Sequence, residues 1–217
     1  MKRRSLPIAV AFAATSALLL SGCGGDDGGS GEGDEIAGAA KDPAAGQSAE
    51  SPSGDAVKRP SVTLPSDVKN VFDGWEAGDT AKDAVLTDVT HRINATDAAI
   101  VAADPDSDAL RFYYKGEALA GAATWVKGYV DEGRSITGTV RFYDPDLVMV
   151  DKDTAALAYC ADESKASDKD RKTGKADRTP VTKDSYVAYN SRLEKGEDGV
   201  WRTTVLESER GNAKCVR

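Results

Sequence analysis

The feature that most limits what this chain can fold into is a long stretch with few large apolar side chains. It runs from Gly24 to about Ser61, opens with the letters GGDDGGSGEGDE, and contains almost nothing apolar that is larger than alanine. Such a segment cannot bury enough surface to offset the entropy lost on ordering, so it is expected to be disordered. We therefore predict a linker over residues 23–61 and one folded domain over residues 62–217, a length of about 155 residues that suits a single domain.

The N-terminus has the pattern of an export signal. Lys2, Arg3 and Arg4 precede an almost wholly apolar run over residues 6–20. This run is shorter than the roughly 20 residues that a membrane-spanning helix needs, and the basic head with a small-residue exit is typical of a secretory signal peptide. We therefore predict a signal peptide over residues 1–22.

The signal ends in Leu20-Ser21-Gly22-Cys23, which resembles the lipobox of bacterial lipoproteins. The resemblance implies cleavage before Cys23 and a diacylglyceryl group on its sulfur. It also implies a partner, the membrane, and a location on the outer face of the bacterial cytoplasmic membrane, because two acyl chains give stable anchoring. The alternative is a plain secreted protein with a chance cysteine after its signal.

The charge of the chain argues against one class of partner. Residues 1–22 hold three basic and no acidic residues, so their removal lowers the net charge from −8 to −11. Binding to a phosphate backbone needs clustered lysine and arginine. We therefore expect no nucleic-acid partner.

The two remaining cysteines, Cys160 and Cys215, are an even number in an oxidising compartment. We expect them to form a disulfide that closes a loop of about 55 residues, worth on the order of 4 kcal/mol by the chain-entropy estimate. Two free buried thiols are the alternative.

The first half of the domain has helical periodicity. Val68, Val71, Phe72 and Trp75 recur at helical spacing and predict a short helix with Ser66 as its N-cap. A longer helix is predicted from Asp79-Thr80 to a stop at residues 104–106, and a third segment over residues 108–131, divided near Gly116 and Gly121 and ended by Gly133.

After Arg134 the apolar period changes to two, as in half-buried strands. The pattern predicts strands over residues 136–143, 147–161 (one kinked strand or two pieces), 185–193 and 200–209. The charged run over residues 162–178 has no large apolar residue and is predicted to be a long exposed loop. Helices followed by antiparallel strands indicate an α+β fold with the N-terminal helices packed on one face of a curved antiparallel sheet.

The order of these elements carries a second resemblance. With residues 159–164 on an internal strand and a last strand that contains Trp201, residues 79–217 resemble the cone-shaped NTF2-like (SnoaL-like) domain of secreted actinobacterial lipoproteins. The resemblance implies that aromatic side chains line the mouth of the cone, where a small apolar ligand would bind. The candidate pocket residues are Tyr113, Trp125, Tyr129, Phe142, Tyr159, Tyr189 and Trp201. Packing in the core is the alternative role for each of them.

No catalytic residue, metal site or cofactor is predicted. His91 is the only histidine, which excludes a multi-histidine metal site. Its polar neighbours favour an exposed side chain over a catalytic one. The dense carboxylates Asp144, Asp146, Asp151 and Asp153 lie in Asp-Pro-Asp and Asp-Lys-Asp settings that are typical of turns, not of a calcium loop.

The favoured function is a lipid-anchored module that binds a small ligand or an envelope protein. The alternatives are an enzyme of the isomerase, dehydratase or hydrolase type and a structural accessory of envelope assembly, which would use residues 162–178 as its contact surface. An enzyme would place an acidic group or His91 in the pocket with a strongly perturbed pKa, and an accessory would have a filled cone.

Overall fold

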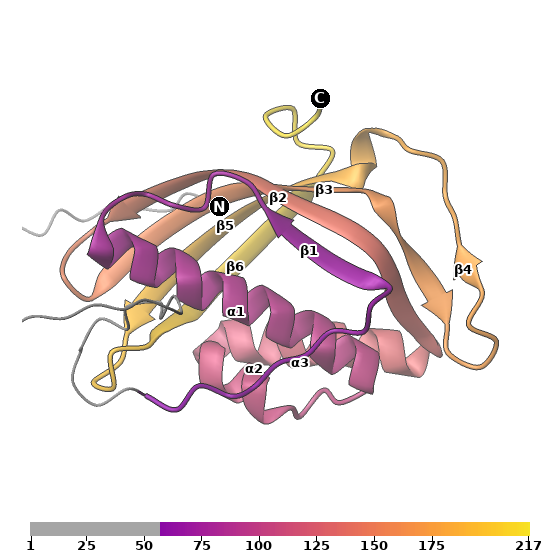
Figure 1. Ribbon diagram of the computed structural model, residues 1–217, viewed down its shortest axis with the longest axis horizontal. Helices are drawn as coiled ribbons and strands as arrows, with labels where there is room; N and C mark the ends of the chain where they lie inside the picture. Colours follow the sequence, from indigo (N-terminus) through magenta and orange to yellow (C-terminus); the bar gives the residue numbers. More distant parts are fainter. Residues whose placement is uncertain (1–56) are drawn as a thin grey trace, which may run out of the picture. The chain divides into compact units, whose positions relative to one another are not determined.

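The computed structural model describes residues 57–217, which form one α+β domain (Figure 1). The predicted signal peptide, Cys23 and most of the predicted linker lie outside the described residues. Within these residues, no helix has both the length and the apolar character needed to cross a bilayer. The elements are β1 (Val68–Phe72), α1 (Thr80–Ala102), α2 (Asp108–Tyr113), α3 (Gly116–Asp131), β2 (Arg134–Met149), β3 (Thr154–Asp170), β4 (Ala176–Asp177), the 3-10 turn η1 (Lys183–Ser185), β5 (Tyr186–Lys195) and β6 (Trp201–Arg210).

The strands form one curved sheet in the order β1-β2-β3-β5-β6, with β4 paired to the far end of β3. The three helices cover the concave face of this sheet (Figure 1). The predicted fold class, helices on one face of a curved sheet, is therefore confirmed. The sheet is mixed, however, because β1 runs parallel to β2 while the longer neighbours pair antiparallel.

The predicted first helix is wrong, since Val68–Phe72 is the strand β1. A spacing of four residues, as between Val68 and Phe72, puts two side chains on one face of a helix and also on one face of a strand. Tertiary packing decides between the two: Phe72 stacks on its register partner Phe142 with ring centroids 5.1 Å apart. Of the predicted helices, α1 begins at the predicted cap, where Asp79 accepts hydrogen bonds from the backbone of Ala81 and Lys82.

The predicted loop over residues 162–178 is also wrong, because β3 continues to Asp170 and a tight turn leads into β4. This half of β3 pairs with the start of β2, and charged side chains add contacts from β3 to β2 and to Asp67, which precedes β1. Arg134 donates to Asp168 at 2.9 Å, and Lys169 donates to Asp67 at 2.7 Å. Backbone pairing and these cross-strand contacts hold a strand that apolar periodicity alone does not reveal.

The curvature of the sheet depends on Gly138 in β2, which has a φ of 100°. A Cβ at this position would lie 2.2 Å from the backbone oxygen of Lys165 on β3. Only glycine allows this conformation and this close approach. On one side of Gly138, residues 134–138 at the start of β2 pair with residues 166–170 at the end of β3.

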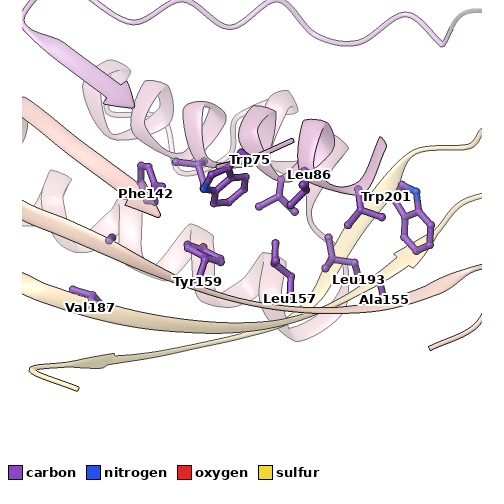
Figure 2. Close-up of a cluster of buried hydrophobic side chains, with 13 residues drawn as sticks. Trp75, Leu86, Phe142, Ala155, Leu157, Tyr159, Val187, Leu193 and Trp201 are labelled. Atoms are coloured by element: carbon purple, nitrogen blue, oxygen red, sulfur yellow. The ribbon is translucent and has the colours of Figure 1, made fainter. Parts of the chain in front are cut away.

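The main core lies between α1 and the concave face of the sheet (Figure 2). Trp75 and Leu86 meet Leu157 and Tyr159, whose side chains point from β3 toward α1. On another side of β3, a disulfide joins Cys160 to Cys215 in the C-terminal tail, with the Cα atoms 5.5 Å apart, as predicted.

The residues just before β1 belong to the folded body. The sequence assigned residues 57–61 to the linker, but Arg59 forms a 2.9 Å ion pair with Asp88 of α1, whose side chain is fully buried. Asp88 also accepts the backbone N–H of Trp201 at 2.9 Å. One buried carboxylate thereby ties the start of the described chain to α1 and β6.

Candidate functional site: a cavity under the curved sheet

A cavity of about 970 Å³ lies in the domain, lined by residues of α1, α3 and all six strands and by the connection before β5. Its walls combine aromatic and aliphatic side chains with nine charged side chains, one amide and several hydroxyl groups. The apolar part of the lining comprises Val68, Ile93, Ile100, Ala122, Ile136, Val140, Phe142, Val187 and Leu206 together with the aromatic residues given below.

Five of the seven aromatic residues that the sequence proposed for a pocket line this cavity. They are Trp125, Tyr129, Phe142, Tyr159 and Tyr189. Trp125 is 53% exposed and packs edge-on against Tyr129. Tyr159 is 4% exposed, and its ring stacks on Tyr189 with centroids 5.0 Å apart.

Tyr113 and Trp201 do not line the cavity. Tyr113 is fully buried with Ala95 and Val200 in a separate small cluster. Trp201 is buried in the main core close to Leu193 (Figure 2). Both residues therefore have the alternative role, which is packing in the core.

A buried guanidinium lies at the wall of the cavity. Arg92 of α1 is 2% exposed and lines the cavity. It donates to the hydroxyl of Tyr114 at 3.0 Å and to the hydroxyl of Tyr159 at 2.8 Å, while its Nε–H has no partner among the described residues. Arginine does not lose its proton in proteins, so this group is a buried positive charge.

The hydroxyl protons around Arg92 can be assigned from the hydrogen bonds. Thr96 donates its single proton to the carbonyl oxygen of Arg92 at 3.0 Å. In the 2.9 Å contact between Thr96 and Tyr114, Tyr114 must therefore be the donor. Tyr159 accepts from Arg92 and has no acceptor of its own among the described residues. Burial raises the pKa of Tyr159, so its hydroxyl keeps a proton that is free to be donated.

A carboxyl group shares the cavity wall one turn further along α1. Asp97 accepts a 2.6 Å hydrogen bond from the side-chain amide of Asn70 on β1, which also donates to Asn94 at 2.9 Å. Burial raises the pKa of Asp97 to about 6; the Asn70 hydrogen bond opposes the shift and the charge of Glu163 adds to it. A carboxyl group with this pKa is able to exchange a proton near neutral pH.

The two other arginines at the cavity, Arg210 and Arg134, are paired with carboxylates. Arg210 donates to Glu163 at 2.6 Å, and Arg134 donates to Asp168 at 2.9 Å. Burial raises the pKa of Tyr129, which lies near two of these carboxylates, and burial also raises the pKa of Tyr189 well above its ordinary value. Both phenols are therefore neutral at this wall.

The remaining candidates from the sequence lie outside the cavity. His91 stacks on Tyr113 with ring centroids 5.9 Å apart and does not line the cavity. Asp144 pairs with Arg217 at the C-terminus, and Asp151 accepts the backbone N–H of Asp153 within a turn, so both carboxylates have partners outside the cavity. Among residues 57–217, no three metal-ligating side chains gather in one place.

Sequence reasoning missed the polar residues of the cavity: Asn70, Arg92, Thr96, Asp97 and Tyr114. A signal for three of them exists in α1, where Arg92, Thr96 and Asp97 share a helix face with Ile93 and Ile100. Polar residues within an apolar stripe indicate buried partners or a ligand. Their partners come from β1, β3 and the C-cap of α2, which the linear pattern does not bring together.

The comparisons with known proteins find similarity in the fold and not in the sequence. No family model matches the chain, and no curated protein matches it. Among solved structures, it is similar to the intermembrane space region of the chloroplast protein ARC6, with TM-score 0.41 and 12% identity over 57% of this chain and 92% of that chain. A ketosteroid isomerase-like protein from Erwinia carotovora atroseptica has TM-score 0.40 and 13% identity over 58% of this chain and 93% of that chain.

A third similar structure is an NTF-2 like protein of unknown function from Shewanella oneidensis, with TM-score 0.36 and 18% identity over 56% of this chain and 96% of that chain. At these identities and TM-scores, the likeness gives no information about the ligand or the activity of this chain.

Proposed function

We propose that this chain is a lipid-anchored, extracytoplasmic lipoprotein whose NTF2-like domain binds a small, largely apolar molecule in the cavity under its sheet. The observation that supports the proposal is the cavity of about 970 Å³ with six aromatic side chains in its wall. Small-molecule sites have volumes of roughly 300–1,000 Å³ and combine mostly apolar walls with a few polar groups. A structural accessory would have a filled cone instead.

A titration with N-phenyl-1-naphthylamine tests the proposal, because this uncharged probe becomes fluorescent in apolar surroundings. The Val140→Trp variant places a large side chain in the cavity wall, and we expect it to weaken probe binding by about tenfold or more, which corresponds to about 1.4 kcal/mol. Val148→Trp is the matched control, since Val148 lies on the same strand, is exposed and does not line the cavity.

Two results would contradict ligand binding in the cavity. One is a wild-type domain that does not bind the probe. The other is equal binding by the Val140→Trp and Val148→Trp variants, which would locate the probe elsewhere on the surface.

The lipid anchor is a separate part of the proposal and is supported by Leu20-Ser21-Gly22-Cys23 after a basic and apolar head. Mass spectrometry of the N-terminal peptide, after expression in a bacterium that processes lipoproteins, should find a chain that begins at Cys23 and carries diacylglyceryl mass. The Cys23→Ser variant should be released from the membrane fraction. An unmodified Cys23 thiol in the wild-type protein would contradict anchoring.

A second candidate function, an acid–base enzyme, is favoured by Asp97. Its carboxyl group lies in a cavity with mixed apolar and polar walls and has a pKa of about 6, and a general base near its operating pH contributes typically 10²–10⁴-fold to a rate. Ring opening of 5-nitrobenzisoxazole needs only one base, which removes the C3 proton while the N–O bond breaks to give a cyanophenolate. Acceleration that Asp97→Asn abolishes and the exposed-site control Asp106→Asn keeps would support this candidate, and equal rates in both variants would contradict it.

A further inference from the structure

Arg92 is the one arginine at the cavity whose charge no carboxylate balances at ion-pair distance. Three arginines line the cavity within the described residues: Arg92, Arg134 and Arg210. Arg134 pairs with Asp168, and Arg210 pairs with Glu163. No carboxylate of the described residues lies within 4.0 Å of the Arg92 guanidinium, although Arg92 is the most buried of the three.

A buried charge without a counter-ion is costly, because burial removes the water that would otherwise stabilise it. The hydroxyls of Tyr114 and Tyr159 satisfy two N–H groups of Arg92 but supply no negative charge. Asp97 lines the same cavity, but its carboxylate is engaged by Asn70. The free domain therefore holds Arg92 in a state that an anion would stabilise.

Hydrogen-bond donors without acceptors accompany this charge. The Nε–H of Arg92 has no partner among the described residues, and the proton assignment above leaves the O–H of Tyr159 free as well. Both groups belong to side chains that line the cavity and are more than nine-tenths buried. A cationic head group would meet the charge of Arg92 with repulsion, whereas an anionic oxygen accepts hydrogen bonds from an arginine and a tyrosine.

We infer that the ligand of this cavity is an apolar organic anion, whose charged oxygen group, of the carboxylate or sulfonate kind, binds Arg92 and Tyr159. The inference rests on the proposed ligand-binding function. The apolar body of the ligand lies against the aliphatic and aromatic wall that Val140, Phe142 and Tyr189 provide.

A matched pair of fluorescent probes tests the inference. 8-Anilinonaphthalene-1-sulfonate differs from N-phenyl-1-naphthylamine by one sulfonate group, so their comparison isolates the anion. Arg92→Met should weaken binding of the sulfonate probe by about 10- to 100-fold and change binding of the neutral probe by no more than about twofold. Arg92→Lys retains the charge and should keep part of the preference for the sulfonate probe.

Arg111→Met is the control for loss of one positive charge, because Arg111 lies on α2 and does not line the cavity. It should leave both affinities unchanged. A second measurement uses the wild-type domain alone, in case Arg92→Met does not fold. In its ¹H–¹⁵N spectrum, the Nε–H signal of Arg92 should shift with the sulfonate probe far more than with the neutral one.

The outcomes separate the two claims. If the wild-type domain binds neither probe, ligand binding itself is wrong. If the neutral probe binds in the cavity, but Arg92→Met affects both probes equally or the Nε–H signal shifts no further with the sulfonate probe, the cavity binds ligands and the anion inference is wrong.

Discussion

At the level of single residues, the cavity depends on polar side chains that α1 carries within its apolar face. Arg92, Thr96 and Asp97 lie beside Ile93 and Ile100, and their partners are hydroxyl and amide groups from other elements. Arginine supplies the fixed charge of the site, and the aspartate supplies a group that titrates. The chemistry of the cavity is therefore set mainly by one helix.

The raised pKa of Asp97 predicts a pH dependence of stability. Its ordinary value is 3.8 and its value in the folded domain is about 6, with Glu163, Arg92 and Asn70 as its polar neighbours. Between these values, the unfolded chain releases the proton while the folded domain keeps it, so the folded state loses stability as pH rises. Asp97→Asn does not titrate and should gain stability relative to wild type, on the order of 1–2 kcal/mol, between about pH 4 and about pH 7.

Urea unfolding of the wild type and of Asp97→Asn at several pH values measures this difference. Asp106→Asn is a suitable control because Asp106 is exposed on the turn before α2. A free-energy difference between Asp97→Asn and wild type that stays constant over this pH range would show that Asp97 is not perturbed in the folded domain.

The sequence predicted part of the site at this scale. Phe142, Tyr159 and Tyr189 are candidates because the resemblance to a cone-shaped domain implies that aromatic side chains line its mouth. Arg92 was missed because its partners, Tyr114 and Tyr159, lie 22 and 67 residues further along the chain. Only the folded arrangement shows that this arginine is buried.

At the level of elements, the bend in β2 determines the concave face on which the cavity depends. Gly138 provides the bend through a backbone conformation that residues with a Cβ rarely adopt. Sequence periodicity predicted strands here, but periodicity contains no information about curvature. It also failed at β1 and at the far half of β3, where a spacing shared by helix and strand and a lack of apolar residues hid the pairing.

Gly138→Ala should destabilise the domain by about 2 kcal/mol or more, since its Cβ would clash with the Lys165 carbonyl at a positive φ. Gly128→Ala on α3 is the opposite case: nothing lies within 4 Å of its added Cβ. In a helix this change should stabilise by roughly 0.5–1 kcal/mol. Thermal or urea unfolding of the two variants checks both signs, and equal stability of the two would refute the role of Gly138 in the bend.

At the level of the whole molecule, the order of helices and strands was sufficient to predict the fold class, because each element has an apolar face that must be covered. Whether the resulting cone is filled or hollow could not be predicted. That outcome depends on how far the bent strands stand away from α1 and α3, and on polar pairs such as Arg210 with Glu163 at the wall. The proposed lipid anchor would place this cavity outside the cytoplasmic membrane, where ligands from the envelope can reach it.

A crystal structure of the domain with N-phenyl-1-naphthylamine tests the central claim, ligand binding under the sheet, most directly. The account predicts electron density for the probe between α1 and the concave face, in contact with Val140 and Tyr189. Density for the probe only on the outer surface, or a cavity filled by side chains from its own walls, would contradict the account.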